Sequence, residues 1–203
     1  GIVEGGGGKG RGNTAYLKPL PKQHSRSIYV GNLPHGIDIA SVAELALSHG
    51  LLESVKFFQT YAFLNFVEDS ASDSFWQQGQ TSSGAQGVYL RGRQLMVNWG
   101  RPLPPDPSIR AAVSRGATRH IAIGPTNPQT TQAQVSEILA PFGEIESVWL
   151  MPDSGFAIVN MMNIQHAVAA KEALHAKQMS GPPPYQLEVQ YSMPPQQRMG
   201  GSR

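Results

Sequence analysis

The stretch LESVKFFQTYAFLNF at residues 52–66 has a second copy, IESVWLMPDSGFAIVNM, at residues 145–161. LESV matches IESV at an offset of 93 residues, and YAFLNF at 61–66 matches FAIVNM at 156–161. Further upstream, Ile28 and Gly31 match Ile121 and Gly124 at the same offset. A repeated block identifies the structural unit of a chain. The sequence therefore predicts two copies of one domain.

Each copy has the order strand, helix, strand, strand, helix, strand. In the first copy, Asp38 or Ser41 can cap the first helix, and a weaker helix is expected near 69–78. In the second copy, Thr131 and Gln134 have the spacing of a capping box, and a second helix is expected over 163–177. Two βαβ halves joined by a strand hairpin form a four-stranded antiparallel sheet with both helices on one face. The predicted fold class is α+β, with two tandem β-α-β-β-α-β ferredoxin-like domains.

Composition sets the expected boundaries between these domains. The chain has 203 residues with 22 Gly and 16 Pro, and its net charge is +2. Blocks 26–100 and 119–192 each hold six carboxylates, against four and three basic residues, so the folded parts are mildly acidic. We expect a flexible Gly-rich segment at 1–25, domains at 26–101 and 119–192, and a disordered tail at 193–203. Between the domains, 102–118 is expected to be a flexible, Pro-rich basic linker in which SIRAAVSRG can form two helical turns.

Several function classes are disfavoured by the sequence. The chain has no Cys and no apolar run of about 20 residues, so we expect a soluble protein of the cytoplasm or nucleus, without membrane contact. The six His are scattered and accompany no nucleophile motif, phosphate-binding glycine loop or metal-ligand cluster. We therefore expect a monomer that is not an enzyme and needs no cofactor or metal.

Aromatic residues fall on the face of the first sheet that no helix covers. Alternation along IYVGNL at 28–33 turns Tyr29 outward, and alternation along YAFLNF turns Tyr61, Phe63 and Asn65 outward. Because an open sheet face is usually polar, three neighbouring aromatics there indicate a binding platform. Trp99 shares its parity with core residues and is expected to be buried.

The two motifs resemble those of the RNA recognition motif family. IYVGNL matches the family's hexamer motif, and QTYAFLNF at 59–66 matches most of its octamer motif, with Gln59 and Thr60 in place of the usual cation and glycine. The resemblance covers 26–101 and 119–192. It implies that the aromatic platform stacks unpaired bases of single-stranded RNA and that Asn65 and Asn98 face the RNA. RNA affinity would then depend on stacking, or on Lys56, Arg26 and Arg101 in place of the missing cation.

The second copy departs from the family pattern. Ala122 stands at the first stacking position and Ile158 at the third, so that only Phe156 of the motif aromatics remains. Trp149 is expected to turn outward beside it. The alternatives that stay open for this copy are a smaller, displaced RNA platform, or a sheet that binds a protein partner or packs on the first copy.

The linker tract GRPLPPDPSIRAAVSRGATRHIAIG at 100–124 resembles that of fungal multi-domain RNA-binding proteins of the negative-regulator-of-differentiation type. This likeness implies a longer parent protein, mRNA targets, a preference for pyrimidine-rich, U-containing RNA, and a role in post-transcriptional regulation. The linker and second domain would assist the first on one RNA strand. The residues expected to contact RNA are Tyr29, Tyr61, Phe63, Asn65, Lys56, Gln59, Asn98, Arg101, Trp149, Phe156, Asn160, Arg115 and Arg119.

Overall fold

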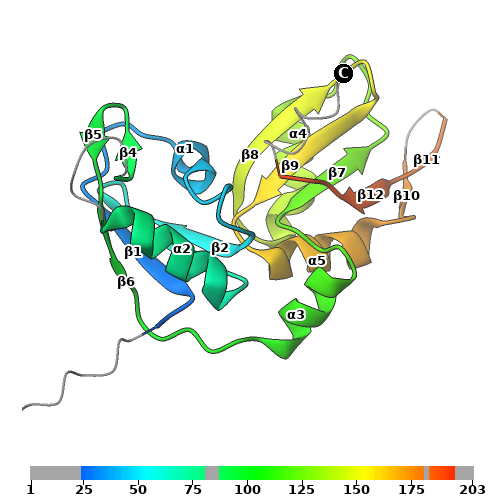
Figure 1. Cartoon of the computed structure of the whole chain (residues 1–203). Helices are drawn as coiled ribbons and strands as arrows, with labels where there is room; N and C mark the ends of the chain where they lie inside the picture. The colour runs from blue at the N-terminus through cyan, green and yellow to red at the C-terminus, as the bar shows by residue number, and fades with distance from the viewer. Residues whose placement is uncertain (1–23, 81–86, 181–182, 195–203) are drawn as a thin grey trace, which may run out of the picture.

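The computed structural model describes residues 24–80, 87–180 and 183–194, so the predictions for 1–23 and 195–203 lie outside the described residues. Two four-stranded antiparallel sheets lie side by side (Figure 1). The first domain comprises β1 (Ser27–Gly31), α1 (Ile39–Glu44), β2 (Leu52–Phe57), β3 (Tyr61–Phe66), α2 (Asp69–Gly79), β4 (Tyr89–Leu90), β5 (Arg93–Gln94) and β6 (Met96–Trp99). The second comprises β7 (His120–Gly124), α4 (Gln132–Leu139), a 3-10 turn (Ala140–Phe142), β8 (Ile145–Met151), β9 (Phe156–Met161), α5 (Ile164–Leu174), β10 (Gln178–Met179), β11 (Tyr185–Gln186) and β12 (Glu188–Tyr191).

The two sheets have the same topology. Their strand orders are β2-β3-β1-β6 and β8-β9-β7-β12, which correspond strand for strand. The predicted α+β fold with two tandem β-α-β-β-α-β domains is therefore confirmed. Each domain also carries a two-stranded hairpin before its last long strand, β4–β5 or β10–β11, which the sequence reading did not predict.

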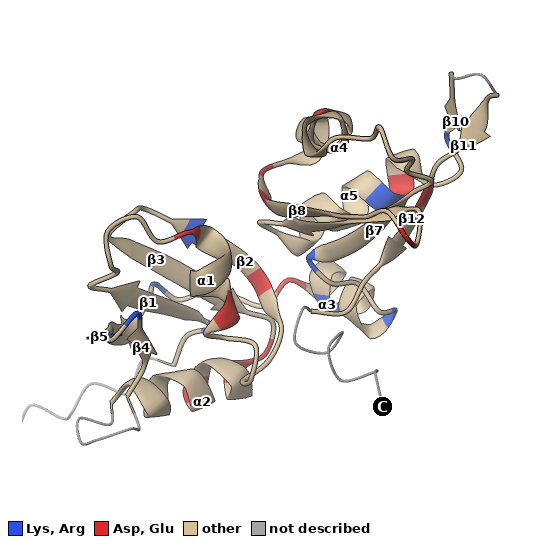
Figure 2. Ribbon diagram, turned by 90° about the horizontal axis from the view of Figure 1, so that it is seen from above, with Lys and Arg blue, Asp and Glu red and all other residues tan. Residues whose placement is uncertain are grey.

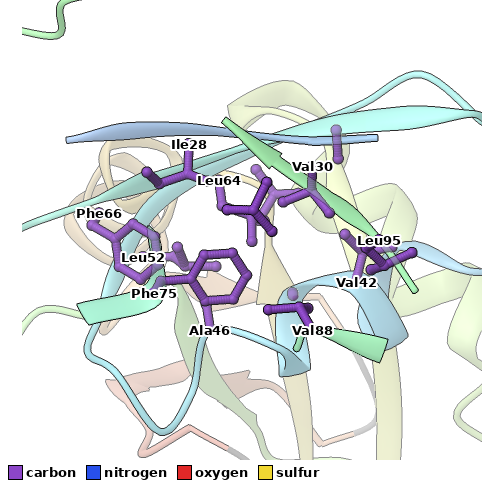
Figure 3. Close-up of a cluster of buried hydrophobic side chains, with 14 of the residues drawn as sticks. Ile28, Val30, Val42, Ala46, Leu52, Leu64, Phe66, Phe75, Val88 and Leu95 are labelled. Atoms are coloured by element: carbon purple, nitrogen blue, oxygen red, sulfur yellow. The ribbon is translucent and has the colours of Figure 1, made fainter. Parts of the chain in front are cut away.

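The core of each domain lies between the sheet and its helices. In the first domain, alternate residues of the strands point inward, and Ile28, Leu64 and Phe66 are fully buried. Phe75 of α2 packs on Phe66 with ring centroids 5.8 Å apart (Figure 3). The second domain has a corresponding buried core, which includes Ile121, Val159, Met161, Leu139 and Val189. Helix starts follow the sequence: Asp38 accepts from the Ser41 amide, and Thr131 and Gln134 form a reciprocal capping box.

The connection between the domains is ordered and packed. Helix α3 (Pro107–Ser114) supplies the two helical turns that the sequence allowed. Its buried Ile109 and Ala112 pack with Val67 of the first domain and Ile164 of the second in one apolar cluster. The expectation of a flexible linker is therefore wrong for this helix, because its apolar side chains are buried against both domains.

A backbone contact also joins the domains directly. The Val55 amide of strand β2 donates to the Met162 carbonyl at 2.9 Å, just before α5 begins, and Ser54 forms an isolated antiparallel bridge with Asn163. The Met162 side chain packs into the core of the first domain. The edge of the first sheet at β2 is thus partly covered by the second domain.

The open faces of the two sheets point to opposite sides of the molecule. Helix α1 lies against strand β8 of the other domain, while strand β2 lies against helix α5. The sheet layer of each domain thus meets the helix layer of the other. Seen from above, α1 and α2 lie on one side of their sheet, and α4 lies on the opposite side of its own (Figure 2).

Candidate nucleic-acid interface

Side chains on the open face of the first domain, the first face, form rows across the strands. Lys56 of β2, Phe63 of β3, Tyr29 of β1 and Asn98 of β6 are direct cross-strand partners and make up the middle row. In the next row, Tyr61 and Met96 flank Gly31. The structure thus brings the three predicted aromatics together on a surface without helices.

The rings of the first face form one cluster. The Tyr61 ring stacks between Phe58, at 4.9 Å and 15°, and Tyr29, at 5.6 Å and 30°. Phe63 meets the edges of Tyr29 and Tyr61 at 5.7 and 6.0 Å. Because each ring is supported by another, the platform is held in place before any ligand arrives.

Phe58 belongs to this platform although the sequence reading did not select it. It follows β2 in the tight turn to β3, where its amide donates to the Tyr61 carbonyl, and Gln59 beside it has a φ of 58°. The Phe58 side chain is 48% exposed. Alternation from Lys56 through Phe57 to Phe58 was the signal that places this ring on the outer face.

Glycine is needed at the centre of the platform. A Cβ atom on Gly31 would lie 2.6 Å from the Tyr29 hydroxyl oxygen and 2.7 Å from its ring, so the Tyr29 side chain lies over the Gly31 backbone. In the second domain a Cβ on Gly124 would lie 2.8 Å from the Phe156 ring. The same glycine therefore supports an aromatic ring in each domain, from different strands.

The third row of each face does not hold the base-reading amides that the family resemblance implied. Asn65 is only 5% exposed, and its amide donates to the Ser54 hydroxyl at 2.8 Å. Asn160 is 2% exposed and bonds both the Ser147 hydroxyl and His120. These two predicted contacts are corrected: both amides are buried and bonded within the protein.

Arg119 is also corrected as a predicted RNA contact. Its guanidinium is buried, pairs with Glu146 at 2.8 Å and donates to the Met161 carbonyl at 2.7 Å. Arg26, a further candidate cation in the first domain, is corrected in the same way: it pairs with Glu53 at 2.6 Å and donates to the Phe66 carbonyl. A buried arginine with these partners cannot reach a phosphate without leaving a buried carboxylate unpaired.

The other polar candidates are accessible. Lys56, Gln59 and Asn98 are exposed on or beside the first face. Arg101 and Arg115 are exposed in the connection between the domains. Arg110, in α3, lies 3.6 Å from Glu68, and both side chains are largely solvated. Trp99, which was expected to be buried, is partly buried: it stacks on Trp76 at 5.2 Å and packs against the edge of the core.

The open face of the second domain, the second face, has the same rows with different residues. Trp149, Ile158, Ala122 and Gln190 form the middle row, and Met151 pairs with Phe156 in the next. Trp149 is 60% exposed, whereas Ile158 is buried. The structure brings Trp149 and Phe156 onto one face, as the sequence indicated, together with an exposed Met151.

Comparisons with known proteins agree with this fold. The family model of the RNA recognition motif matches residues 121–183. The RNA-binding protein MRN1 of Saccharomyces cerevisiae is 26% identical over 162 residues, covering 74% of this chain and 26% of its own length. The meiotically up-regulated gene 24 protein of Schizosaccharomyces pombe is 26% identical over 153 residues, covering 74% of this chain and 23% of its own.

Among solved structures, the Sex-lethal RNA recognition domains 1 and 2 from Drosophila melanogaster are 19% identical. They cover 82% of this chain and 99% of their own, with a TM-score of 0.30. The chain spans about a quarter of the length of the two fungal relatives. Residues 121–183 match the family model of the RNA recognition motif, and the sheet of the first domain has the same strand order as the sheet that contains this match.

Proposed function

We propose that the chain binds single-stranded RNA through the first face. The observation that carries this proposal is the cluster of Tyr29, Phe58, Tyr61 and Phe63, whose rings lie within 4.9 to 6.3 Å of their neighbours on a face without helices. Unpaired bases stack on such rings, at about 1–3 kcal/mol per base.

Polar groups around the platform suit a nucleic-acid strand. Lys56 stands opposite Phe63, and Asn98 stands opposite Tyr29. A lysine beside a stacked base can pair with a phosphate, and an exposed amide can donate to and accept from a base edge. Gln59 and Arg101 lie farther out and would contact the strand as it leaves the platform.

The finer proposal is selectivity for pyrimidine-rich, U-containing mRNA in post-transcriptional regulation, in the cytoplasm or nucleus. It is supported by the likeness of the linker tract and by the names of relatives such as the RNA-binding protein MRN1. Among the described residues, no group of three or more potential metal ligands comes together, and no helix is long and apolar enough to cross a membrane. The stacked rings of the first face fit a binding function.

An assisting role for the second domain faces a geometric requirement. Because the two faces point to opposite sides, one RNA strand can touch both only by passing around the molecule (Figure 2). Of the linker arginines, Arg119 is engaged in a buried pair, and Arg101 and Arg115 remain exposed for such a path. RNAs with two uridine tracts and spacers of increasing length test this role.

The test of the main proposal is a pair of substitutions on the first face. Tyr29→Ala and Phe63→Ala should each weaken binding of an eight-nucleotide oligouridine by about 1–3 kcal/mol, measured by fluorescence anisotropy. Tyr89→Ala, which removes an exposed aromatic from the β4–β5 hairpin, is the matched control and should leave affinity unchanged. Unchanged affinity in both platform variants would refute the proposal.

A further inference from the structure

The second face carries a continuous apolar strip along β8 and β9. Trp149 pairs directly with Ile158, and Met151 pairs directly with Phe156. These four residues are defined here as the β8–β9 strip. Trp149 and Met151 are its most exposed members, at 60% and 44%. Two large exposed apolar side chains on one edge of a sheet are suited to contact with another apolar surface.

The charges around the strip are acidic. Strands β7, β8, β9 and β12 contain no Lys or Arg. Glu146 is neutralised by Arg119. Glu188, on the outer face opposite Gly124, accepts a hydrogen bond from the Gln190 amide but makes no ion pair among the described residues, so its charge is not neutralised. Asp153 adds a second, exposed carboxylate in the turn between β8 and β9. These carboxylates would repel a phosphate backbone and attract a cation.

We propose that the second face is a docking site for a protein segment that presents apolar side chains together with lysine or arginine. The apolar side chains would cover Trp149 and Met151, and the basic ones would pair with Glu188 and Asp153. This inference does not depend on RNA binding by the first domain. Since the faces point to opposite sides, the chain can hold RNA and this segment at the same time and so link the two.

A second copy of the chain is a weaker occupant for the same face. In a two-fold dimer the same patch of both copies meets, which would bring the two sets of Glu188 and Asp153 into one contact. Like charges juxtaposed in an interface are unfavourable. The carboxylates of Glu188 and Asp153 therefore favour a basic partner over self-association.

Trp149 provides its own reporter for the test. Of the three tryptophans in the chain, Trp76 and Trp99 stack on each other in the first domain, and Trp149 is the one more than half exposed. The full chain is titrated with two matched twelve-residue peptides, one alternating leucine with arginine and the other alternating leucine with glutamate. Binding is followed by tryptophan emission and by anisotropy of the labelled peptides.

The leucine–arginine peptide should bind at least tenfold more tightly than the leucine–glutamate peptide and should shift the Trp149 emission. Trp149→Ala should weaken that binding at least tenfold, with an unchanged melting curve because the side chain is exposed. Glu188→Lys combined with Asp153→Lys should reverse the preference between the peptides. Oligouridine affinity should change less than twofold in these variants, and Phe63→Ala should leave peptide binding unchanged.

Three results would overturn the inference. One is equal binding of the two peptides by the unmodified chain. Another is a tenfold loss of oligouridine affinity on Trp149→Ala, which would make the second face an RNA surface. The third is a dimer in sedimentation that dissociates on Trp149→Ala, which would make a second copy the occupant.

Discussion

Lys56 in the first domain and Trp149 in the second occupy the same place on their sheets, each directly opposite the middle residue of the neighbouring strand, Phe63 or Ile158. Moving across the row, Tyr29 is replaced by Ala122. The first face has a cation beside a cluster of four aromatic rings, and the second has an indole beside aliphatic side chains. Because the backbone topology is the same, the difference between the faces lies in their outward side chains alone.

A second pair of equivalent positions on the two faces differs in charge. Met96 of β6 lies opposite Gly31, and Glu188 of β12 lies opposite Gly124, the equivalent glycine of the second domain. One domain thus places a polarizable apolar side chain where the other places a carboxylate. Together with Lys56, this difference supports the proposal that the two faces take different ligands.

The largest expected effect concerns the buried core, which the two domains have in common. Leu64 and Val159 are fully buried at equivalent places in β3 and β9. Leu64→Ala should cost about 2–5 kcal/mol of unfolding free energy in a denaturant titration, and Val159→Ala should cost less because it removes fewer atoms. The fraction of each variant that remains folded should bind oligouridine with unchanged affinity. A stable Leu64→Ala variant that fails to bind RNA would place Leu64 on the wrong side of the sheet.

The next effect tests whether the outward residues decide ligand choice. Ala122→Tyr with Ile158→Phe rebuilds on the second face the two rings that Phe63 and Tyr29 supply on the first. In a chain already carrying Tyr29→Ala, this double change should restore about 1–3 kcal/mol of oligouridine binding. Ala122→Leu with Ile158→Leu adds apolar bulk without rings and should restore none. Equal recovery in both variants would mean that apolar area, not base stacking, holds the RNA.

A smaller effect concerns Lys56. Each phosphate contact on a single strand contributes about −0.7 to the slope of log affinity against log salt concentration. Lys56→Ala should therefore make the slope shallower by about 0.7. The matched control is Lys171 of α5, whose Nζ lies 4.4 Å from the centroid of the Tyr191 ring. Lys171→Ala should leave the slope unchanged. If both variants change the slope alike, the cation's place on the first face is irrelevant.

The smallest effect concerns the helix that joins the two domains. The Ser108 hydroxyl and amide donate to the Asp106 carboxylate at 2.7 and 2.8 Å, and these bonds hold the pKa of Asp106 below its ordinary value. A lowered folded pKa means that the cap stabilises α3 above the ordinary aspartate range and loses this contribution as pH falls through the folded value. Amide exchange in 107–114, corrected for intrinsic rates, should therefore rise on acidification, and Asp106→Ala should raise it at neutral pH. The control variant, Asp153→Ala, should leave amide exchange in 107–114 unchanged.

Much of the fold could be predicted because the repeat, at an offset of 93 residues for the first two strands and 95 for the third, contains both the strands and their alternation. Tyr29, Tyr61 and Phe63 followed from that alternation. The same alternation, continued one residue past the end of β2, also turns Phe58 outward, but this ring was not selected because it lies in the turn beside Gln59. The burial of Asn65 and Asn160 could not be read from alternation either, because it depends on the Ser54 and Ser147 hydroxyls that bond them.

The paired arginines were within reach of sequence reasoning. Arg26 and Arg119 are 93 residues apart, as are Glu53 and Glu146 in the repeated LESV and IESV tetrapeptides. A charge pair that recurs at the repeat offset indicates an ion pair inside each domain rather than an RNA contact. The opposite orientation of the two faces, by contrast, depends on how α3 and Met162 pack, and no local pattern encodes that packing.

The most direct test of the difference between the faces is an amide and indole chemical-shift titration of the intact chain with oligouridine. If RNA binds the first face alone, the amide signals of Gly31 and Phe63 should move along one binding curve, while the Trp149 indole signal should stay in place. Movement of the Trp149 indole along that curve, with Gly31 and Phe63 unchanged, would contradict the account.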